Sequence, residues 1–402
     1  MAIVSLSELI GQPDVSAFLQ GVVAGGRYGN AYLFHGPAGV GKGTAALAFA
    51  RAMLCEHGAP RVPKAPGLFD LAPAAAAPAG PANDACGKCS ACLKAASLQH
   101  PDLKFIFPVS GEGKEQEELI ADTWEGIRND PLFVFKYDKA ASIRLSITRD
   151  LLRDLAYKPF EAARRVVVVR DADRMREDQY SAMLKAIEEP ASTTSWILTT
   201  SRLTRLPATI RSRCQKVRFA ALPEEMVRTF LETRAGQGEK AARMLAALAG
   251  GSLARALVLR DLDPRAERDA ALALLTPALR GDAAALWTAA QKATRYGKSG
   301  REALRRMAEF HQLWLRDLLR ARYGAAREDL VNRDLETEVR RQAEGVDATE
   351  IRRRLMVLEE MVRAIEGNVS ADAAIFSGLL RVSGARPGEG EWPRHATARW
   401  DY

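Results

Sequence analysis

The chain has no run of about eighteen uncharged apolar residues, so we expect no segment that spans a membrane. Its start, Met1-Ala2-Ile3-Val4-Ser5, lacks the basic residues and the apolar stretch of a secretory signal. We therefore expect a cytoplasmic protein. No internal repeat is visible. The length of 402 residues, with 47% hydrophobic and 27% charged residues, is typical of a globular protein with two or three domains.

Cysteine is scarce, and the five cysteines are unevenly placed. Cys86, Cys89 and Cys92 form a C-x2-C-x2-C pattern, and Cys55 precedes them. In a chain without a secretory signal, such clustering favours metal binding over disulfide bonds. Four thiolates complete a tetrahedral zinc site with no open coordination position. The spacing therefore predicts a structural zinc rather than a catalytic one.

An iron–sulfur cluster or a set of unrelated thiols fits this cysteine pattern less well. A cluster of the ferredoxin type needs a fourth cysteine shortly after Cys92, and Ala96 stands there instead. Unrelated buried thiols rarely give three cysteines at this spacing. Cys214 stands alone, and we expect it to be a small core residue.

The chain also lacks a hydroxyl where a nucleotide-binding motif needs one. Residues 36–43 follow the phosphate-loop pattern G-x-x-x-x-G-K-[ST], with matching residues at Gly36, Gly39, Gly41 and Lys42. Gly43 stands where a Ser or Thr would hold Mg²⁺. An apolar strand precedes the loop and a helix follows it, which favours a genuine phosphate loop over an ordinary glycine-rich turn. The motif predicts a nucleotide-binding fold whose catalysis has decayed.

The other expected Mg²⁺ groups are altered too. Thr44 comes one residue late, and the helix turns its side chain by about 100° from the expected direction. A second strand should end in an Asp-Glu pair, but strand 165–169 is followed by Arg170 and Asp171. A cation beside the Mg²⁺ position is electrostatically unfavourable. Alternatively, Asp171 and Asp173 cap the following helix. The loss of two catalytic positions disfavours hydrolysis.

Alternating strands and helices through about residue 219 predict a doubly wound α/β domain. The expected strands are 31–35, 132–137, 165–169, 195–200 and 216–219, and the expected helices are 7–27, 44–54, 115–128, 146–157 and 178–188. After Pro223 the pattern is helical throughout, with long helices expected at 301–323 and 348–367. Residues 58–84 are rich in Ala, Pro and Gly, and we expect a loose or disordered segment there.

Several motifs together resemble one protein family, the bacterial DNA polymerase III clamp-loader ATPases of the AAA+ class. The motifs are the phosphate loop, the four clustered cysteines, Leu184-Lys185-Ala186-Ile187-Glu188-Glu189-Pro190, Leu206-Pro207-Ala208-Thr209-Ile210 and Ser212-Arg213-Cys214. The resemblance covers residues 5–260 well and the helical remainder more loosely. It implies an AAA+ P-loop α/β domain, then a small helical lid and an all-α collar. The corresponding residues are 1–219 with a zinc-binding insertion at 55–92, 220–262 for the lid, 263–383 for the collar, and 384–402 for a flexible tail.

Two kinds of subunit compete within this family. The motor subunit (gamma/tau) needs the loop Ser/Thr, the Asp-Glu pair and a lid arginine. This chain has Gly43, Arg170 and Asp171, and Ala254 stands where the lid arginine would fall, with Arg255 one residue off. Each of these residues differs from what the motor subunit needs, so together they favour the non-motor delta prime subunit. Its ATPase would be absent or very weak, and ATP or ADP would bind doubtfully at a degenerate site of Gly36, Gly39, Gly41, Lys42, Gly43 and Thr44.

The resemblance also implies partners. Arg213 would act in trans as an arginine finger in a neighbouring motor subunit's ATP site. The chain would work with motor and delta subunits, the sliding clamp and primer-template DNA, without a membrane. The net charge of +8 permits nucleic acid, although scattered basic residues also suit a solvated face. The alternatives are an active motor ATPase, a small-molecule P-loop kinase and a nucleic-acid-binding scaffold.

Overall fold

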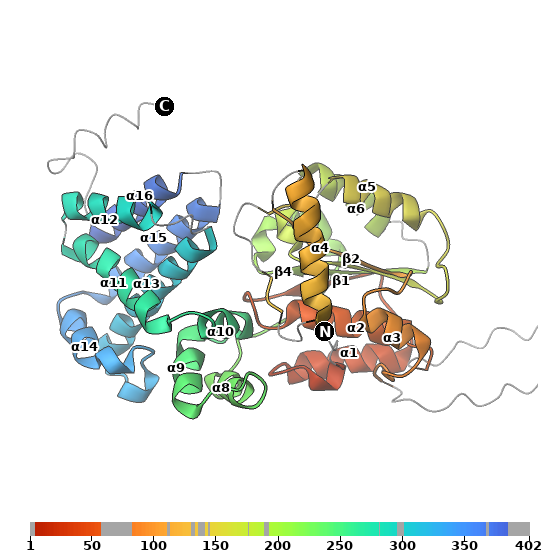
Figure 1. Ribbon diagram of the computed structural model, residues 1–402, viewed down its shortest axis with the longest axis horizontal. Helices are drawn as coiled ribbons and strands as arrows, with labels where there is room; N and C mark the ends of the chain where they lie inside the picture. Colours follow the sequence, from red (N-terminus) through yellow and green to blue (C-terminus); the bar gives the residue numbers. More distant parts are fainter. Residues whose placement is uncertain are drawn as a thin grey trace, which may run out of the picture. The chain divides into compact units, whose positions relative to one another are not determined.

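The computed structural model describes residues 5–57, 83–110, 113–129, 133–135, 141–143, 145–175, 177–188, 193–280, 282–295, 301–366 and 370–384. These residues form two compact units, which meet in sequence between Leu257 and Val258 (Figure 1). The expected loose segments at 58–84 and 384–402 fall almost wholly outside the described residues. The division into P-loop domain, lid, collar and tail stays a prediction.

The first unit is built on a parallel five-stranded sheet with the order β2-β3-β4-β1-β5. The strands are β1 (Ala31–His35), β2 (Leu103–Ile106), β3 (Arg165–Val169), β4 (Thr194–Thr200) and β5 (Gln215–Arg218). Every residue of β3 and β4 is buried, as expected for central strands covered on both faces. The strands predicted at 31–35 and 165–169 are confirmed at both ends, and those at 195–200 and 216–219 to within one residue.

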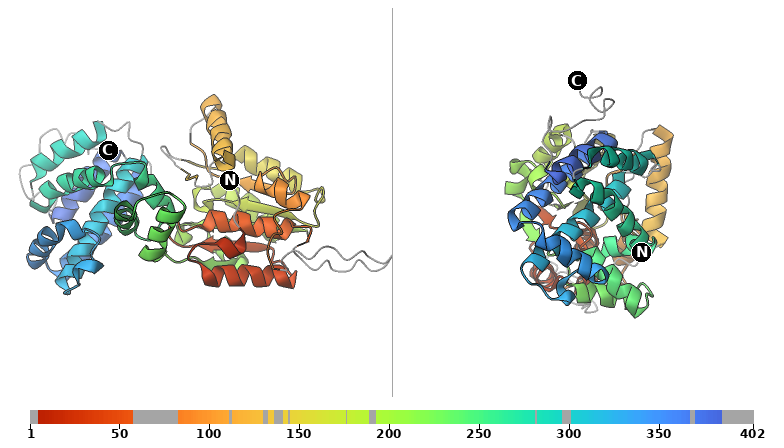
Figure 2. Two further views of the ribbon diagram at one scale, coloured as in Figure 1. Left: turned by 60° about the horizontal axis from the view of Figure 1, so that its bottom comes forward. Right: turned by 90° about the vertical axis from the view of Figure 1, so that its left-hand side faces the viewer.

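Successive side chains of the buried strands enter two different cores. Val166 and Val168 of β3 belong to one core, and Val167 and Val169 belong to the other. Helices α1 (Pro13–Gly25), α2 (Lys42–Leu54), α3 (Ser90–Ala96) and α4 (Gly113–Asn129) contribute to the first, and α5 (Leu145–Leu155), α6 (Glu177–Glu188) and α7 (Ala208–Arg213) contribute to the second (Figure 2). The predicted α/β fold is therefore confirmed, because the sheet carries helices on both faces.

Two local predictions were wrong. The helix expected at 7–27 begins only at Pro13, which suits the first turn because it has no N–H to leave unpaired. A short 3-10 helix, η1 (Leu6–Glu8), and Gly11 with a φ of 65° precede it. The strand expected at 132–137 is irregular over its described residues 133–135. There Phe135 packs edge-on against Phe105 and Phe107 instead of joining the sheet. The strand β2 was not predicted.

Three helices follow β5: α8 (Glu224–Thr233), α9 (Glu239–Ala249) and α10 (Leu253–Arg260). The boundary between the two units falls within α10. Between α9 and α10 lie Gly250 and Gly251, with φ values of 58° and 84°. A Cβ atom on Gly251 would lie 2.7 Å from the Leu222 carbonyl oxygen, so this turn requires glycine. The turn fixes the start of α10 against the rest of the unit.

The second unit is helical throughout its described residues. Its helices are α11 (Pro264–Arg280), α12 (Ala283–Arg295), α13 (Arg301–Arg322), η4 (Arg327–Asp329), η5 (Arg333–Leu335), α14 (Glu336–Glu344), α15 (Ala348–Glu366) and α16 (Ala371–Ser383). Inside it, Trp287 and Phe376 meet edge to face with ring centroids 4.8 Å apart. The buried Asp317 carboxylate accepts the backbone N–H groups of Val331 and Asn332, fixing the loop before η5. Among the described residues, no helix has the length and apolar character to cross a membrane.

Candidate functional site

The phosphate loop lies between β1 and α2, where the sequence predicted it. Gly36, Gly39 and Gly41 have φ values of 145°, 74° and 97°, which disfavour any residue with a Cβ atom. A Cβ atom on Gly36 would also lie 2.2 Å from the Phe219 carbonyl oxygen. The loop therefore keeps the backbone shape that its glycines predict. Thr44 follows in the first turn of α2 and is half-buried.

Lys42 begins α2 and is 5% exposed. Its Nζ donates to the Gly36 carbonyl oxygen at 2.9 Å and to the Ser201 hydroxyl at 3.1 Å. Burial is the main reason that the pKa of Lys42 falls to about 8; the charge of Arg170 also lowers it, whereas Asp171 and Asp173 raise it. The sequence did not single out Ser201. The sequence feature that could have identified Ser201 is a hydroxyl-bearing residue directly after β4, the strand that pairs with β1.

Arg170 fills the space beside Gly43. A Cβ atom on Gly43 would lie 2.3 Å from Nη1 of Arg170, so a Ser or Thr at this position would require the guanidinium to move. The guanidinium lies 3.9 Å from the ring centroid of Phe135, and its Nε lies 3.4 Å from a carboxylate oxygen of Asp171. A cation therefore occupies the side of the loop where the usual hydroxyl would hold Mg²⁺. These residues do not fit a conventionally bound Mg²⁺ ion.

The two acidic residues after β3 form hydrogen bonds with residues at the end of β4 and just beyond it. Asp171 adopts a left-handed conformation with a φ of 46°, and its N–H donates to the Thr199 hydroxyl at 3.0 Å. Asp173 is buried, and it accepts hydrogen bonds from the Thr200 hydroxyl at 2.7 Å and from Arg202 Nε at 2.8 Å. Neither caps α6, which begins at Glu177, so the alternative prediction of an N-cap was wrong. Asp173 instead ties the end of β3 to the end of β4.

The start of α10 contacts the phosphate loop. The N–H of Ala254 donates to the Gly39 carbonyl oxygen at 3.2 Å, and the N–H of Arg255 donates to the Ser252 hydroxyl at 3.2 Å. A Cβ atom on Gly39 would lie 2.8 Å from the Ala254 Cβ. The residue that faces the loop at this point is thus alanine, whose side chain offers no charge to a phosphate.

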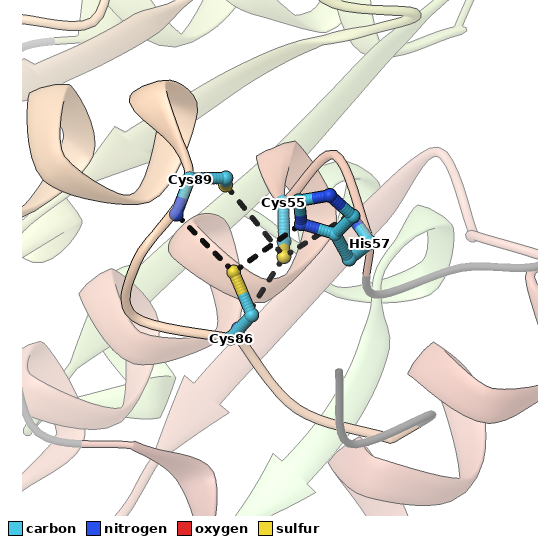
Figure 3. A group of neighbouring side chains, drawn as sticks. All are labelled: Cys55, His57, Cys86 and Cys89. Atoms are coloured by element: carbon cyan, nitrogen blue, oxygen red, sulfur yellow. Dashed lines mark hydrogen bonds between the residues drawn. The ribbon is translucent and has the colours of Figure 1, made fainter. Parts of the chain in front are cut away.

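Cys55, Cys86 and Cys89 come together at the other end of α2 (Figure 3), and Cys92 lies beside Cys86. Cys55 is the C-cap of α2 and Cys89 is the N-cap of α3. The sulfurs of Cys55 and Cys89 are 4.0 Å apart, and those of Cys86 and Cys92 are 3.9 Å apart. Tetrahedral zinc with Zn–S bonds of about 2.3 Å places its sulfurs about 3.8 Å apart. These two sulfur–sulfur distances fit a tetrahedral metal ion, and the predicted set of four cysteine ligands stays a prediction.

His57 joins this cluster, and sequence reasoning missed it. Its Nδ1 lies 3.5 Å from the sulfur of Cys86, and donor atoms of Cys55, His57, Cys86 and Cys89 all lie within 4.8 Å of one another. The available signal was the spacing Cys55-x-His57.

The thiol of Cys92 donates to Cys55, and this is the main reason that the pKa of Cys55 falls to about 4.

The remaining cysteine behaves as predicted. Cys214 is buried in the core formed by α5, α6 and α7, and burial raises the pKa of its thiol to about 11. It is an ordinary core residue rather than a reactive one.

Arg213 ends α7 and is 41% exposed. Its Nη2 lies 2.7 Å from a carboxylate oxygen of Glu188, the last residue of α6, and its Nη1 donates to the Thr209 carbonyl oxygen at 3.1 Å. The sequence pointed to Arg213 but not to this ion pair. The guanidinium is held at the surface, where a second molecule has access to it.

A sequence model of the family described as "DNA polymerase III, delta subunit" matches residues 11–66 and 58–223. The chain belongs to this family. The resemblance to clamp-loader AAA+ subunits predicted from the motifs is thereby confirmed.

Relatives of this family member include two tau subunits. The Escherichia coli (strain K12) "DNA polymerase III subunit tau" is 26% identical over 262 residues, which cover 64% of this chain and 32% of that protein. The Bacillus subtilis (strain 168) "DNA polymerase III subunit tau" is 23% identical over 221 residues, which cover 55% and 30%. The chain thus matches about a third of the length of these relatives.

Among solved structures, a DNA polymerase III, gamma subunit-related protein from Thermotoga maritima aligns over 73% of this chain and 97% of its own. Its sequence is 17% identical, and the TM-score is 0.31.

We expect Gly39→Ala to lower the free energy of unfolding by about 2 kcal/mol or more, because Gly39 has a φ of 74° and a new Cβ would lie 2.1 Å from the Ser252 hydroxyl oxygen. Urea denaturation followed by circular dichroism measures this change. The control is Gly21→Ala in α1, where a Cβ meets open space and a neutral or slightly stabilising effect is expected. Equal stability of both variants would contradict the tight contact between the loop and α10.

Proposed function

We propose that the chain is a non-motor, delta prime-like subunit of the DNA polymerase III clamp loader. In this role it helps to load the sliding clamp on primed DNA together with motor and delta subunits. The observation that carries the proposal is the guanidinium of Arg170 beside Gly43. A subunit that cannot hold Mg²⁺ at its own phosphate loop is suited to a fixed, non-hydrolysing place in an ATP-driven assembly.

Two further observations support the loss of motor activity. Lys42 donates its hydrogen bonds to the loop carbonyl of Gly36 and to Ser201 instead of reaching outward. Ala254 faces Gly39 where a motor subunit would have an arginine. The loop has thus lost a metal ligand and a lid cation, both of which stabilise charge on a transferring phosphoryl group.

Arg213 is the group that this subunit would contribute to ATP hydrolysis. Its guanidinium is exposed at the end of a short helix, and Glu188 orients it without burying it. A cation delivered across a subunit boundary stabilises the negative charge that develops on phosphate oxygens. We propose that Arg213 acts in this way on ATP bound by a neighbouring motor subunit.

The cysteine cluster completes the proposal with a structural zinc ion. Cys55, Cys86, Cys89 and Cys92 would supply four thiolates, and zinc would link the end of α2 to α3. Short backbone N–H contacts to the sulfurs support this role, because such contacts stabilise thiolates bound to a metal. With four protein ligands, the metal would have no catalytic position.

An active motor ATPase is the second candidate. It is favoured by the relatives, several of which are named tau or gamma subunits. It is disfavoured by Arg170, because a motor site needs a metal where this chain has a guanidinium. Measurement of ATP turnover separates the two candidates.

We expect the isolated chain to hydrolyse ATP at the background rate, and Gly43→Thr to leave that rate unchanged. The threonine restores a hydroxyl, but Arg170 keeps a positive charge beside it and repels Mg²⁺. Steady-state phosphate release with and without Mg²⁺ measures both proteins, with Lys42→Ala as the control for contaminating ATPases. If the native chain hydrolysed ATP at the rate of a motor subunit, the non-motor proposal would be wrong.

We expect Arg213→Ala to slow ATP turnover of the reconstituted clamp loader, because the neighbouring site loses a cation that is worth about 10³-fold or more in the rate at a site with an arginine finger. Thermal unfolding of the chain should stay nearly unchanged, since the side chain is exposed. Arg243→Ala, which removes another exposed arginine paired within its own helix, is the matched control. Equal turnover of the Arg213 variant and the native complex would rule out the finger role.

We expect one zinc ion per chain after purification without chelator, and a lower melting temperature after its removal. The reason is that bound metal stabilises only the folded arrangement of the ligands. Elemental analysis and differential scanning calorimetry measure the two quantities. A metal content near zero would remove the zinc from the proposal.

A further inference from the structure

The cysteine–histidine cluster at the end of α2 offers more possible ligands than a tetrahedral metal ion can bind. Four thiols and one imidazole gather at the end of α2, whereas zinc in a structural site takes four ligands. Cys55, Cys86 and Cys89 take part in either possible set. The fourth place has two candidates, Cys92 and His57, and they differ in chemistry and in surroundings.

Cys92 is the buried candidate. It lies inside α3 with no exposed surface, and its sulfur is 3.9 Å from that of Cys86. The backbone N–H of Cys92 donates to the sulfur of Cys89 at 3.3 Å, which fixes the two residues relative to each other. The helix thus supplies this ligand from a rigid support.

His57 is the candidate on the solvent side. It lies three residues beyond the end of α2, is partly exposed, and directs Nδ1 to within 3.5 Å of the sulfur of Cys86 (Figure 3). The backbone N–H of His57 donates to the sulfur of Cys55 at 3.4 Å, which holds the backbone of His57 close to this thiol. For a Zn–N bond of about 2.05 Å and a Zn–S bond of about 2.3 Å, tetrahedral geometry separates N and S by about 3.5 Å. The ring already has the spacing of a ligand.

We propose that His57 is a reserve zinc ligand, which takes the fourth coordination position when Cys92 cannot bind. The inference rests on the proposed zinc site and adds a second ligand set to it. In the exchange the bond from zinc to the Cys92 sulfur breaks, a bond to Nδ1 of His57 forms, and the released sulfur takes a proton from solvent. Zinc accepts four thiolates, or three thiolates and one imidazole, so the ion stays bound with one thiolate fewer.

Cobalt(II) titration of the full chain tests this, because thiolate-to-metal charge transfer reports the number of sulfur ligands. The native chain should bind one Co²⁺ with the spectrum of four thiolates. Cys92→Ser should still bind one Co²⁺, with about three quarters of the native charge-transfer absorption and shifted d–d bands. The double variant Cys92→Ser/His57→Gln should bind at least about tenfold more weakly than Cys92→Ser. Cys89→Ser is the matched control, and it should lose tight binding because Cys89 belongs to both sets.

The outcomes separate the two proposals. A native chain that binds no Co²⁺ or Zn²⁺ refutes the zinc site itself. A folded Cys92→Ser chain that binds no metal, or whose binding is unaffected by His57→Gln, overturns the reserve ligand alone. Equal retention of metal by the Cys89→Ser control also overturns it, because the fourth place would then not be special.

A second measurement covers the case in which Cys92→Ser does not fold. His57→Gln alone keeps all four cysteines, and it should release zinc to a competing chelator several-fold faster, because no imidazole holds the ion while Cys92 departs. An unchanged release rate would overturn the proposal.

Discussion

The guanidinium of Arg170 beside Gly43 is the constraint on which the phosphate loop depends. The missing side chain at Gly43 leaves room for the cation, and a hydroxyl-bearing side chain at this position would require the guanidinium to move. Phe135 and Asp171 hold the guanidinium from two sides. The glycines keep the shape of the loop, and the buried Lys42 amine binds the loop's own carbonyl oxygen. The glycines therefore keep the architecture of a phosphate loop, and a guanidinium lies where the usual hydroxyl would stand.

Helix α2 joins this loop to the cysteine cluster. It begins at Lys42 and is capped by Cys55, and most of its small and apolar side chains are buried in the first core. Its 13 residues span about 20 Å, so the two sites lie at opposite ends of one rigid element. A metal at the far end would stabilise the C-terminus of a helix whose N-terminus forms part of the loop.

The sheet was predictable where its strands are continuous apolar runs. Strands β1 and β3 match the sequence prediction because central parallel strands bury both faces, and such runs stand out against their polar flanks. The strand predicted at 132–137 was wrong because the aromatic pattern of residues 133–135 resembles that of a strand. Phe135 is partly buried, and it packs against aromatic side chains of β2 and its continuation rather than pairing through its backbone. The late start of α1 follows from Gly11 and Pro13, which local hydrophobic periodicity does not register.

The sequence by itself determined the phosphate loop, the missing hydroxyl at Gly43, the cysteine cluster and the alternation of strands and helices. These are properties of spacing and residue type along a short stretch of chain. Only the tertiary structure decided that Arg170 covers Gly43, that Ala254 meets Gly39 and that His57 stands beside Cys86. These contacts depend on how a flexible side chain or a distant segment packs in three dimensions. Local periodicity carries no information about such packing, which is why the partners of the site became known only from the fold.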